Sequence, residues 1–295
     1  MEELIKAYAP VLCLHPEESY TPMPVEAMIE NAVLKRRVSK KSDPIIIEAP
    51  TMIDLFQGVD PDLYLTYKPG VSLVLLQNKY PNIVYARLAV NGKFLILQFY
   101  FFYLFNDWVN KHEGDWEVVQ IAWAAKEVDT VLLQHIPPSF VTFSQHGYGV
   151  TRPWSRVEVR SGSHPIVYVS QGSHANFFAA GTYYVGIGFE RTGTREVEYT
   201  IEVIPTDLSP SEEIRSKWGW LFFAGHWGRV VCSCLSLYQS GPVGPKFKLM
   251  WDQPLYWAEG KVADNARFAW IGRMLSRLWF PREHLESVHN IDKRR

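Results

Sequence analysis

Three side chains near the middle of the chain have the types and the spacing of a cation site. His112, Asp115 and Glu117 stand in the stretch His-Glu-Gly-Asp-Trp-Glu, at the start of an apolar segment typical of a strand. Successive side chains of a strand point to opposite faces, so Asp115 and Glu117 are predicted to share one face. Gly114 adopts backbone conformations closed to other residues, and it can bring the His112 imidazole round to that face. Two carboxylates and one imidazole suit Mg, Mn, Fe or Zn, so we predict a divalent cation here.

A fourth acid, Asp107, lies shortly before this stretch. It can serve the same cation from across a loop, or it can cap that loop. A structural reading also applies to the other three side chains, because carboxylates at a strand start often pair with a neighbouring Lys or Arg. In that reading His112 is an ordinary loop residue. The spacing alone does not choose between a cation site and ion pairs.

Histidines are candidates for acid–base catalysis, because their side chains gain and lose a proton near neutral pH. Gly-Ser-His occurs at both His164 and His174, with a predicted strand between them that spans roughly 20 Å, so the two imidazoles cannot reach one centre unless the chain doubles back. His174 is the better candidate, because Gly172 and an alanine beside it allow a close approach. His146 ends a strand whose alternate residues are polar. We predict His146 and His174 as catalytic residues, with a satisfied structural histidine as the alternative at each position.

The composition is that of a folded, water-soluble protein. The 295 residues are 47% hydrophobic and 21% charged, and 30 Lys and Arg balance 31 Asp and Glu, which argues against nucleic acid as a partner. The longest apolar run, residues 94–105, is too short to cross a bilayer as a helix. The first residues lack the pattern of a signal peptide, and Cys13, Cys232 and Cys234 suit a reducing compartment, so we expect a cytoplasmic location.

Short strands with turn signals between them predict the elements that position these side chains. Their regular recurrence favours an all-β fold, a two-sheet β-sandwich. Asn91-Gly92 predicts a two-residue hairpin turn of type I′. The predicted strands are residues 33–38, 45–48, 71–76, 83–90, 93–104, 115–123, 131–135, 139–146, 156–160, 166–170, 182–190, 195–204 and 229–238.

Peripheral α-helices are predicted at both ends of the chain. Residues 2–8 predict a short helix, and residues 208–217 predict another, with Ser209 as its cap and Pro210 at its first position. Residues 262–279 are the clearest helix, because apolar side chains recur on one side of it.

We predict a single β-sandwich domain over residues 1–295, in which residues 1–70 are an N-terminal extension packed on the sandwich. Residues 261–295 are predicted as a C-terminal amphipathic helix and tail with an excess of basic side chains. This helix can dock on the body of the protein, or it can lie on an anionic membrane as a peripheral contact.

Several short sequence segments, taken in order along the chain, resemble the vacuolar protein sorting-associated protein 62 family. The similarity covers most of the length, and several words in matching order are more specific than any single one. After Gly181 the chain departs from the family, with Thr-Tyr-Tyr-Val-Gly-Ile-Gly in place of an Asp-rich segment. The matching words are Tyr-Ala-Pro-Val-Leu at 8–12, Leu-His-Pro-Glu-Glu-Ser-Tyr-Thr-Pro at 14–22, the aromatic run 99–108, the acidic word 112–117, Ser-Gln-His at 144–146, and residues 164–168, 172–175, 218–228 and 241–245.

A second, more distant resemblance concerns only the acidic segment His-Glu-Gly-Asp-Trp-Glu at residues 112–117, called the acidic word below. The necrosis-inducing cytolytic proteins carry Gly-His-Arg-His-Asp-Trp-Glu on a β-sandwich. The end of that word is similar to Asp115, Trp116 and Glu117 when its first histidine is matched to His112. In those proteins the word resembles a divalent-cation site used in sphingolipid-dependent membrane attack. A resemblance of this kind does not assign a function by itself.

Three functions are open from the sequence. The first is a metal-dependent hydrolase of a glycan or a lipid headgroup, in which the cation acidifies a bound water. The second is a non-catalytic module that uses a divalent cation to bind a lipid or glycan headgroup at a membrane surface. The third is a structural role for the acidic word through buried hydrogen bonds. We favour the hydrolase, with the binding module as the alternative, although no motif in the sequence names a reaction.

Overall fold

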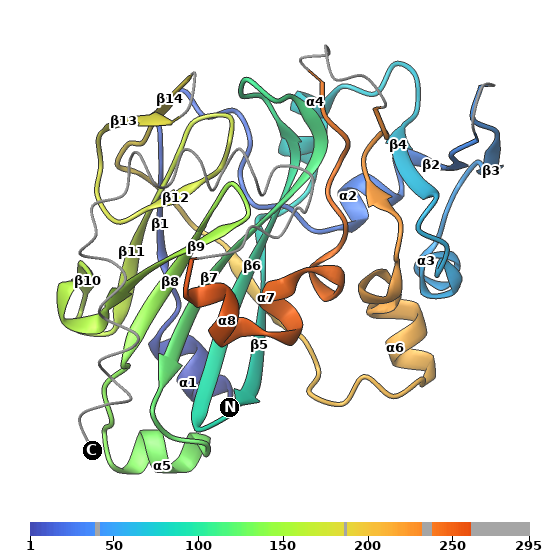
Figure 1. The fold of residues 1–295 in the computed structure, drawn as a ribbon. Helices are drawn as coiled ribbons and strands as arrows, with labels where there is room; N and C mark the ends of the chain where they lie inside the picture. The colour runs from blue at the N-terminus through green and yellow to red at the C-terminus, as the bar shows by residue number, and fades with distance from the viewer. Residues whose placement is uncertain (39–41, 186–187, 232–237, 261–295) are drawn as a thin grey trace.

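The computed structural model of the protein describes residues 1–38, 42–185, 188–231 and 238–260 (Figure 1). Strands predominate, and short helices lie around them, so the prediction of a mostly β chain with peripheral helices is confirmed. In the described residues the strands form four sheets, where the sequence predicted two. The difference arises because several strands pair in parallel with partners far away in the sequence, and local periodicity does not reveal such partners.

The central sheet has six strands in the order β16-β5-β6-β7-β8-β9. Its middle strands, β6 (Phe94–Asn106) and β7 (His112–Trp123), pair antiparallel along nearly their full lengths. β16 pairs in parallel with β5, and the other neighbours in this sheet are antiparallel. The remaining strands are β5 (Ile83–Asn91), β8 (Phe140–Gln145), β9 (Tyr148–Pro153) and β16 (Thr200–Val203).

Two mixed sheets and a hairpin complete the set of strands. One sheet has the order β10-β11-β1-β15, with β12 also paired to β11, and another has the order β17-β4-β2-β3. The strands of the first are β10 (Val159–Arg160), β11 (His164–Val169), β1 (Val11–Leu14), β15 (Arg195–Val197) and β12 (Asn176–Phe177). Those of the second are β17 (His226–Trp227), β4 (Leu63–Tyr67), β2 (Ala32–Arg36) and β3 (Ile45–Ile47). The hairpin consists of β13 (Thr182–Val185) and β14 (Gly188–Arg191).

The helices in the described part of the chain are short, and none of them is long and apolar enough to span a membrane. The α-helices are α1 (Glu2–Ala7), α2 (Glu26–Ile29), α3 (Met52–Gln57), α4 (Leu73–Lys79), α5 (Val128–Leu133), α6 (Glu212–Lys217), α7 (Leu249–Asp252) and α8 (Pro254–Ala258). The 3-10 turns are η1 (Trp154–Arg156), η2 (Gly219–Phe222) and η3 (Pro245–Phe247).

Both faces of the central sheet are buried. Alternate side chains along β6 and β7 point to opposite faces and so belong to two different cores. Phe101 and Val119 pack on one face against Leu12 of β1, in a core that β11 also joins. Phe102 and Trp116 pack on the other face, in a core shared with β2, β4 and α7. Figure 1 shows this arrangement, with β1 and β11 on one side of the central strands and β2 and β4 on the other. A strand buried on both faces has no polar alternation, which explains the unbroken apolar run of β6.

A row of polar side chains crosses the second face near one end of the central sheet. Each member lies opposite the next on the neighbouring strand. The segment that contains α7 and α8 packs on this row. Gln98 donates to the carbonyl of Met250 at 2.8 Å, and Gln120 donates to that of Pro254 at 3.2 Å. The row consists of Arg87, Gln98, Gln120, Thr142 and Thr151.

Some local predictions are wrong. Residues 71–76 and 131–135 lie in α4 and α5 instead of strands, because a short apolar run does not distinguish a strand from a helical turn. Residues 182–190 belong to the β13–β14 hairpin and do not form one strand. Residues 156–160 divide between η1 and β10.

Two predicted signals are displaced by a few residues. The cap of α6 is Ser211, whose hydroxyl accepts a hydrogen bond from the amide of Ile214 at 3.1 Å, and not Ser209. In the hairpin between β5 and β6 the central residue with a positive φ is Gly92, at 58°, so the turn is not of type I′, which needs a positive φ at both central positions. The predicted helix 262–279 and most of the predicted strand 229–238 lie outside the described residues.

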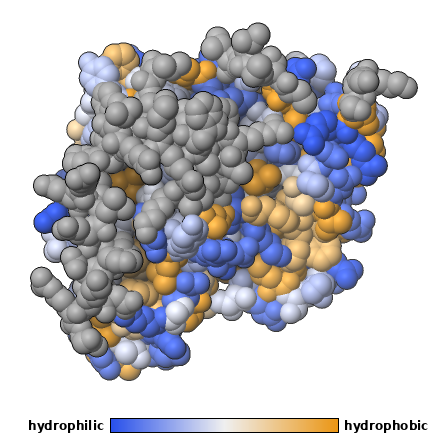
Figure 2. All heavy atoms as spheres, in the orientation of Figure 1, coloured by the Kyte–Doolittle hydropathy of each residue, from blue (hydrophilic) through white to orange (hydrophobic). Residues whose placement is uncertain are grey.

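Hydrophobic and hydrophilic residues are interspersed over the face shown in Figure 2. This mixture agrees with the balanced composition, whose formal net charge is −1.

Candidate functional site

Gly114 reorients the chain where β7 begins. Its φ is +62°, and a Cβ at this position would stand 2.3 Å from the carbonyl oxygen of Trp227, so no larger residue fits without a shift. Glu113 turns toward β4, where Thr66 donates to its carboxylate at 3.1 Å. Asp115 lies within a different group of buried side chains, described next. The left-handed glycine thus separates the carboxylates of Glu113 and Asp115, which two-residue alternation alone would place on one face.

Asp115, His174 and Glu18 form a buried chain of charged groups. Nδ1 of His174 donates to Oδ2 of Asp115 at 2.9 Å, and Nε2 of His174 lies 3.7 Å from Oε1 of Glu18. The second distance exceeds hydrogen-bond length, and Nε2 has no hydrogen-bond partner among the described residues. The imidazole is wholly buried and stacks face to face on Tyr103, with ring centroids 3.8 Å apart.

The charges of Asp115, His174 and Glu18 stabilise one another. Burial by itself favours neutral imidazole, yet the Glu18 charge and the Asp115 hydrogen bond outweigh it and raise the pKa of His174 to about 9. Burial also opposes ionisation of the two acids, but the interaction with His174 lowers the pKa of both Asp115 and Glu18. The arrangement is therefore a cation held between two anions at neutral pH.

Glu117 differs from Asp115 although both project from β7. Burial, and then the neighbouring Asp115 charge, raises the pKa of Glu117 well above its ordinary value. Its carboxyl group accepts a hydrogen bond from the hydroxyl of Ser144, which also accepts from Asn176 at 3.1 Å. His112 is buried as well, and burial lowers its pKa against the opposing effect of the Asp115 charge. Its Nδ1 lies 2.7 Å from the carbonyl oxygen of Gly114.

The predicted cation ligands are therefore only partly brought together. His112, Asp115 and Glu117 share one buried region, whereas Asp107 is exposed and pairs with Lys111. Among the residues that the structure describes, no three His, Cys, Asp or Glu side chains are arranged to hold a metal ion. Asp115 instead bonds the His174 imidazole. We therefore derive no chemical step from a cation at these residues.

The second predicted catalytic histidine, His146, contacts another buried acid. Its Nε2 lies 2.8 Å from Oε1 of Glu190, close enough for an ion pair but without the angles of a hydrogen bond. The other oxygen of Glu190 accepts from the hydroxyls of Ser170 and Ser173. Ser173 directly precedes His174, so one loop carries contacts to both buried acidic groups.

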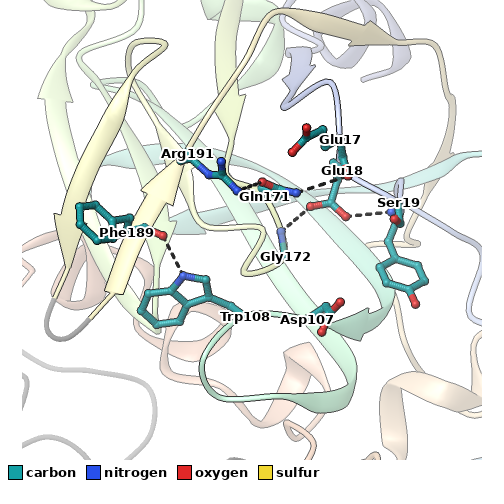
Figure 3. Close-up of a pocket in the computed structure, with 10 residues that line it drawn as sticks. Glu17, Glu18, Ser19, Asp107, Trp108, Gln171, Gly172, Phe189 and Arg191 are labelled. Atoms are coloured by element: carbon teal, nitrogen blue, oxygen red, sulfur yellow. Dashed lines mark hydrogen bonds between the residues drawn. The ribbon is translucent and has the colours of Figure 1, made fainter.

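A pocket of about 200 Å³ opens beside these groups (Figure 3). Glu18 links it to the buried chain, because its carboxylate lines the pocket, accepts from the amide of Gly172 and faces His174. Neither His146 nor His174 is among the residues that line it. The lining residues are Glu17, Glu18, Ser19, Tyr20, Asp107, Trp108, Gln171, Gly172, Phe189 and Arg191.

Sequence reasoning missed the two acids that hold the histidines. Glu18 lies 154 residues from Gly172, its backbone partner, and nothing local distinguishes it from the adjacent Glu17. Glu190 stands in a segment that was predicted as a single strand, although its complete burial requires partners. A positive φ at His146 and at His174 is a further mark of these positions, but only the structure reveals it.

No family model matches the chain, and no curated protein matches it. Solved structures are similar over much of its length at low sequence identity. Examples are "Toxin fold for microbial attack and plant defense" (11% identity, 87% of this chain and 89% of that chain, TM-score 0.44) and "NLPPya in complex with glucosamine" (10%, 87% and 89%, 0.44). Another is Necrosis and Ethylene inducing Protein 2 from the causal agent of cocoa's Witches Broom disease (10%, 74% and 76%, 0.38).

The last of these descriptions names a necrosis-inducing protein, the kind of protein whose sequence motif residues 112–117 resemble. The resemblance to the vacuolar protein sorting-associated protein 62 family finds no support in the comparisons. All three TM-scores lie below 0.5, so the proposals below rest on the residues of this chain.

Proposed function

We propose that this protein is a binding module for a small hydroxyl-rich headgroup, such as one sugar ring of a glycan or glycolipid. The observation that carries the proposal is the pocket of about 200 Å³, which is smaller than the roughly 300–1,000 Å³ of pockets for drug-sized ligands and suits a single ring. The alternative function considered from the sequence was a cation-dependent lipid or glycan binding module at a membrane surface, and this proposal keeps only its headgroup binding.

The lining of the pocket matches such a ligand. Glu17 presents a carboxylate that accepts hydrogen bonds from hydroxyl or ammonium groups. Asp107 adds a carboxylate that also pairs with Lys111, and Arg191 adds a guanidinium that also donates to Gln171. Trp108 adds aromatic surface beside these polar groups, whereas the ring of Phe189 points away from them and packs on Tyr184. A few polar groups in fixed positions next to aromatic walls are typical of small-ligand sites.

The proposal is tested by titrating the full chain with glucosamine, glucose and glycerol, followed by nuclear magnetic resonance shifts and by calorimetry. We expect saturable binding of glucosamine, weaker binding of glucose because it lacks the ammonium group, and none of glycerol. Glu17→Gln is expected to weaken glucosamine binding by about tenfold, because one charged hydrogen bond is lost. Glu3→Gln, an exposed acid of α1 outside the pocket, is the control. Equal responses to all three compounds would contradict the proposal.

A divalent cation at His112, Asp115 and Glu117 stays a prediction. Burial raises the pKa of Glu117, and a coordinating carboxylate must be deprotonated, so cation binding is expected to release protons and to strengthen as pH rises. Melting temperatures with Mg, Mn or Zn at two pH values test this. Glu117→Gln should abolish any metal-induced rise, and Glu113→Gln, at a half-buried acid on the other side of Gly114, should not.

Metal-dependent hydrolysis also stays a prediction. The support for the binding module is that the histidines predicted as catalytic do not line the pocket, and that His174 is wholly buried. A screen of ester, phosphoester and glycoside substrates with added cations separates the two functions. Turnover that disappears in His146→Asn would favour the hydrolase.

A further inference from the structure

Trp108 forms one wall of the pocket, and three contacts fix its indole ring. Its Nε1 donates to the carbonyl oxygen of Phe189 at 2.9 Å, as Figure 3 shows. Gly188 leaves space for the ring, since a Cβ there would stand 2.6 Å from Cζ2 of Trp108. The imidazole of His146 packs against the indole, with centroids 5.0 Å apart and planes inclined by 35°. A side chain held from three sides is already in place before a ligand arrives.

The imidazole of His146 projects from a tight turn. Gln145 pairs with Tyr148, so His146 and Gly147 are the two central residues of the β8–β9 hairpin, with φ values of 52° and 83°. A turn with both central φ values positive prefers Asn, Asp or Gly at its first position. Histidine is also among the residues that adopt this backbone, so the turn fixes where the imidazole starts without excluding it.

Glu190 fixes the imidazole in turn. It is wholly buried on β14, directly after Phe189, and one of its oxygens lies 2.8 Å from Nε2 of His146. The other oxygen is fixed by the hydroxyls of Ser170 and Ser173. The carboxylate therefore connects the β8–β9 turn to the hairpin strand that also accepts the indole hydrogen bond.

We propose that His146 and Glu190 are positioning residues that hold Trp108 as a stacking wall, so that the pocket selects cyclic sugars over open-chain polyols. The face of an indole carries partial negative charge and attracts the C–H groups that line one face of a pyranose ring. An open-chain polyol with the same amine and hydroxyl groups has no such flat face. This selectivity rests on the proposed sugar-binding function, whereas the positioning of Trp108 does not.

The test compares the full chain with His146→Asn, which keeps a residue suited to the left-handed turn and removes only the ring. His135→Asn is the matched control, because His135 is exposed and has a similar φ of 49°. The first readout is hydrogen exchange of the Trp108 indole N–H in ¹⁵N spectra. The second is binding of glucosamine relative to glucosaminitol (2-amino-2-deoxyglucitol), its open-chain counterpart.

We expect His146→Asn to speed indole exchange by about tenfold and to reduce the preference for glucosamine by a similar factor, with no change in His135→Asn. Glu190→Gln should act in the same direction, because it keeps the serine contacts and loses the charge facing His146. Unchanged indole exchange in both variants would overturn the positioning role. Equal binding of glucosamine and glucosaminitol to the unmodified chain would overturn the ring selectivity. Binding of neither compound would instead overturn the proposed function, and indole exchange would still decide the positioning role.

Discussion

A protonated imidazole between two carboxylates dominates the buried site at the scale of single residues. The raised pKa of His174, about 9, means that folding stabilises its charged form. This stabilisation is complete below the ordinary histidine pKa of 6.5, and it is lost as the pH rises through the folded value. We therefore expect the free energy of unfolding to fall between pH 6.5 and pH 9, by at most about 3 kcal/mol. Urea denaturation across this range measures it.

His174→Asn is the informative variant, because asparagine tolerates the left-handed backbone and keeps a donor for Asp115. We expect the variant to lose the decline with pH, and His135→Asn to keep it. Identical slopes for the variant and the unmodified chain would show that His174 is not the group responsible.

The sequence revealed some of these residues and concealed others. The spacing of Asp115 and Glu117 on a strand was visible, because strand alternation is a local property. The roles of Glu18 and Glu190 were not, since each is defined by partners that tertiary folding brings together. The pairing of Asp115 with His174 was also beyond the pattern, because 59 residues separate them.

At the scale of elements, the segment of α7 and α8 is held on the central sheet by hydrogen bonds that its backbone carbonyl groups accept. Gln98→Met removes the donor to Met250 and leaves a buried carbonyl without that bond, while the volume of the side chain is nearly kept. We expect a loss of about 1–3 kcal/mol in the free energy of unfolding, measured in urea. Gln134→Met, an exposed change at the end of α5, should have no effect. A Gln98→Met variant as stable as this control would refute the role of the polar row.

Local pattern predicted the long elements well and the short ones poorly. β6 and β7 were visible because they are long and apolar, and the core confirms why. α4 and α5 were mistaken for strands, since an apolar run of a few residues fits one turn of either element. The four-sheet arrangement depends on parallel pairs such as β1 with β11, for which a sequence offers no local signal.

For the whole molecule, β1 lies inside a sheet, between β11 and β15. Removal of residues 1–24 would therefore take away an internal strand, together with Glu18. We expect the shortened chain to lose cooperative unfolding, measured by circular dichroism on heating, because the core around Leu12 loses one of its layers. A sharp transition near the original temperature would show that the rest of the chain folds without this strand. The prediction of one domain over residues 1–295 stays a prediction.

The parallel pairing of β1 with β11 also constrains how the protein is made. A ribosome releases Val11–Leu14 long before His164–Val169, and Glu18 waits for a backbone partner 154 residues later. Until then the edge of β1 that pairs with β11 lacks its hydrogen-bond partners. Distant contacts of this kind make folding slow and leave nascent chains open to aggregation. The pocket wall at Glu18 therefore cannot form until Gly172 has emerged, and chaperones have that interval in which to act on residues 11–18.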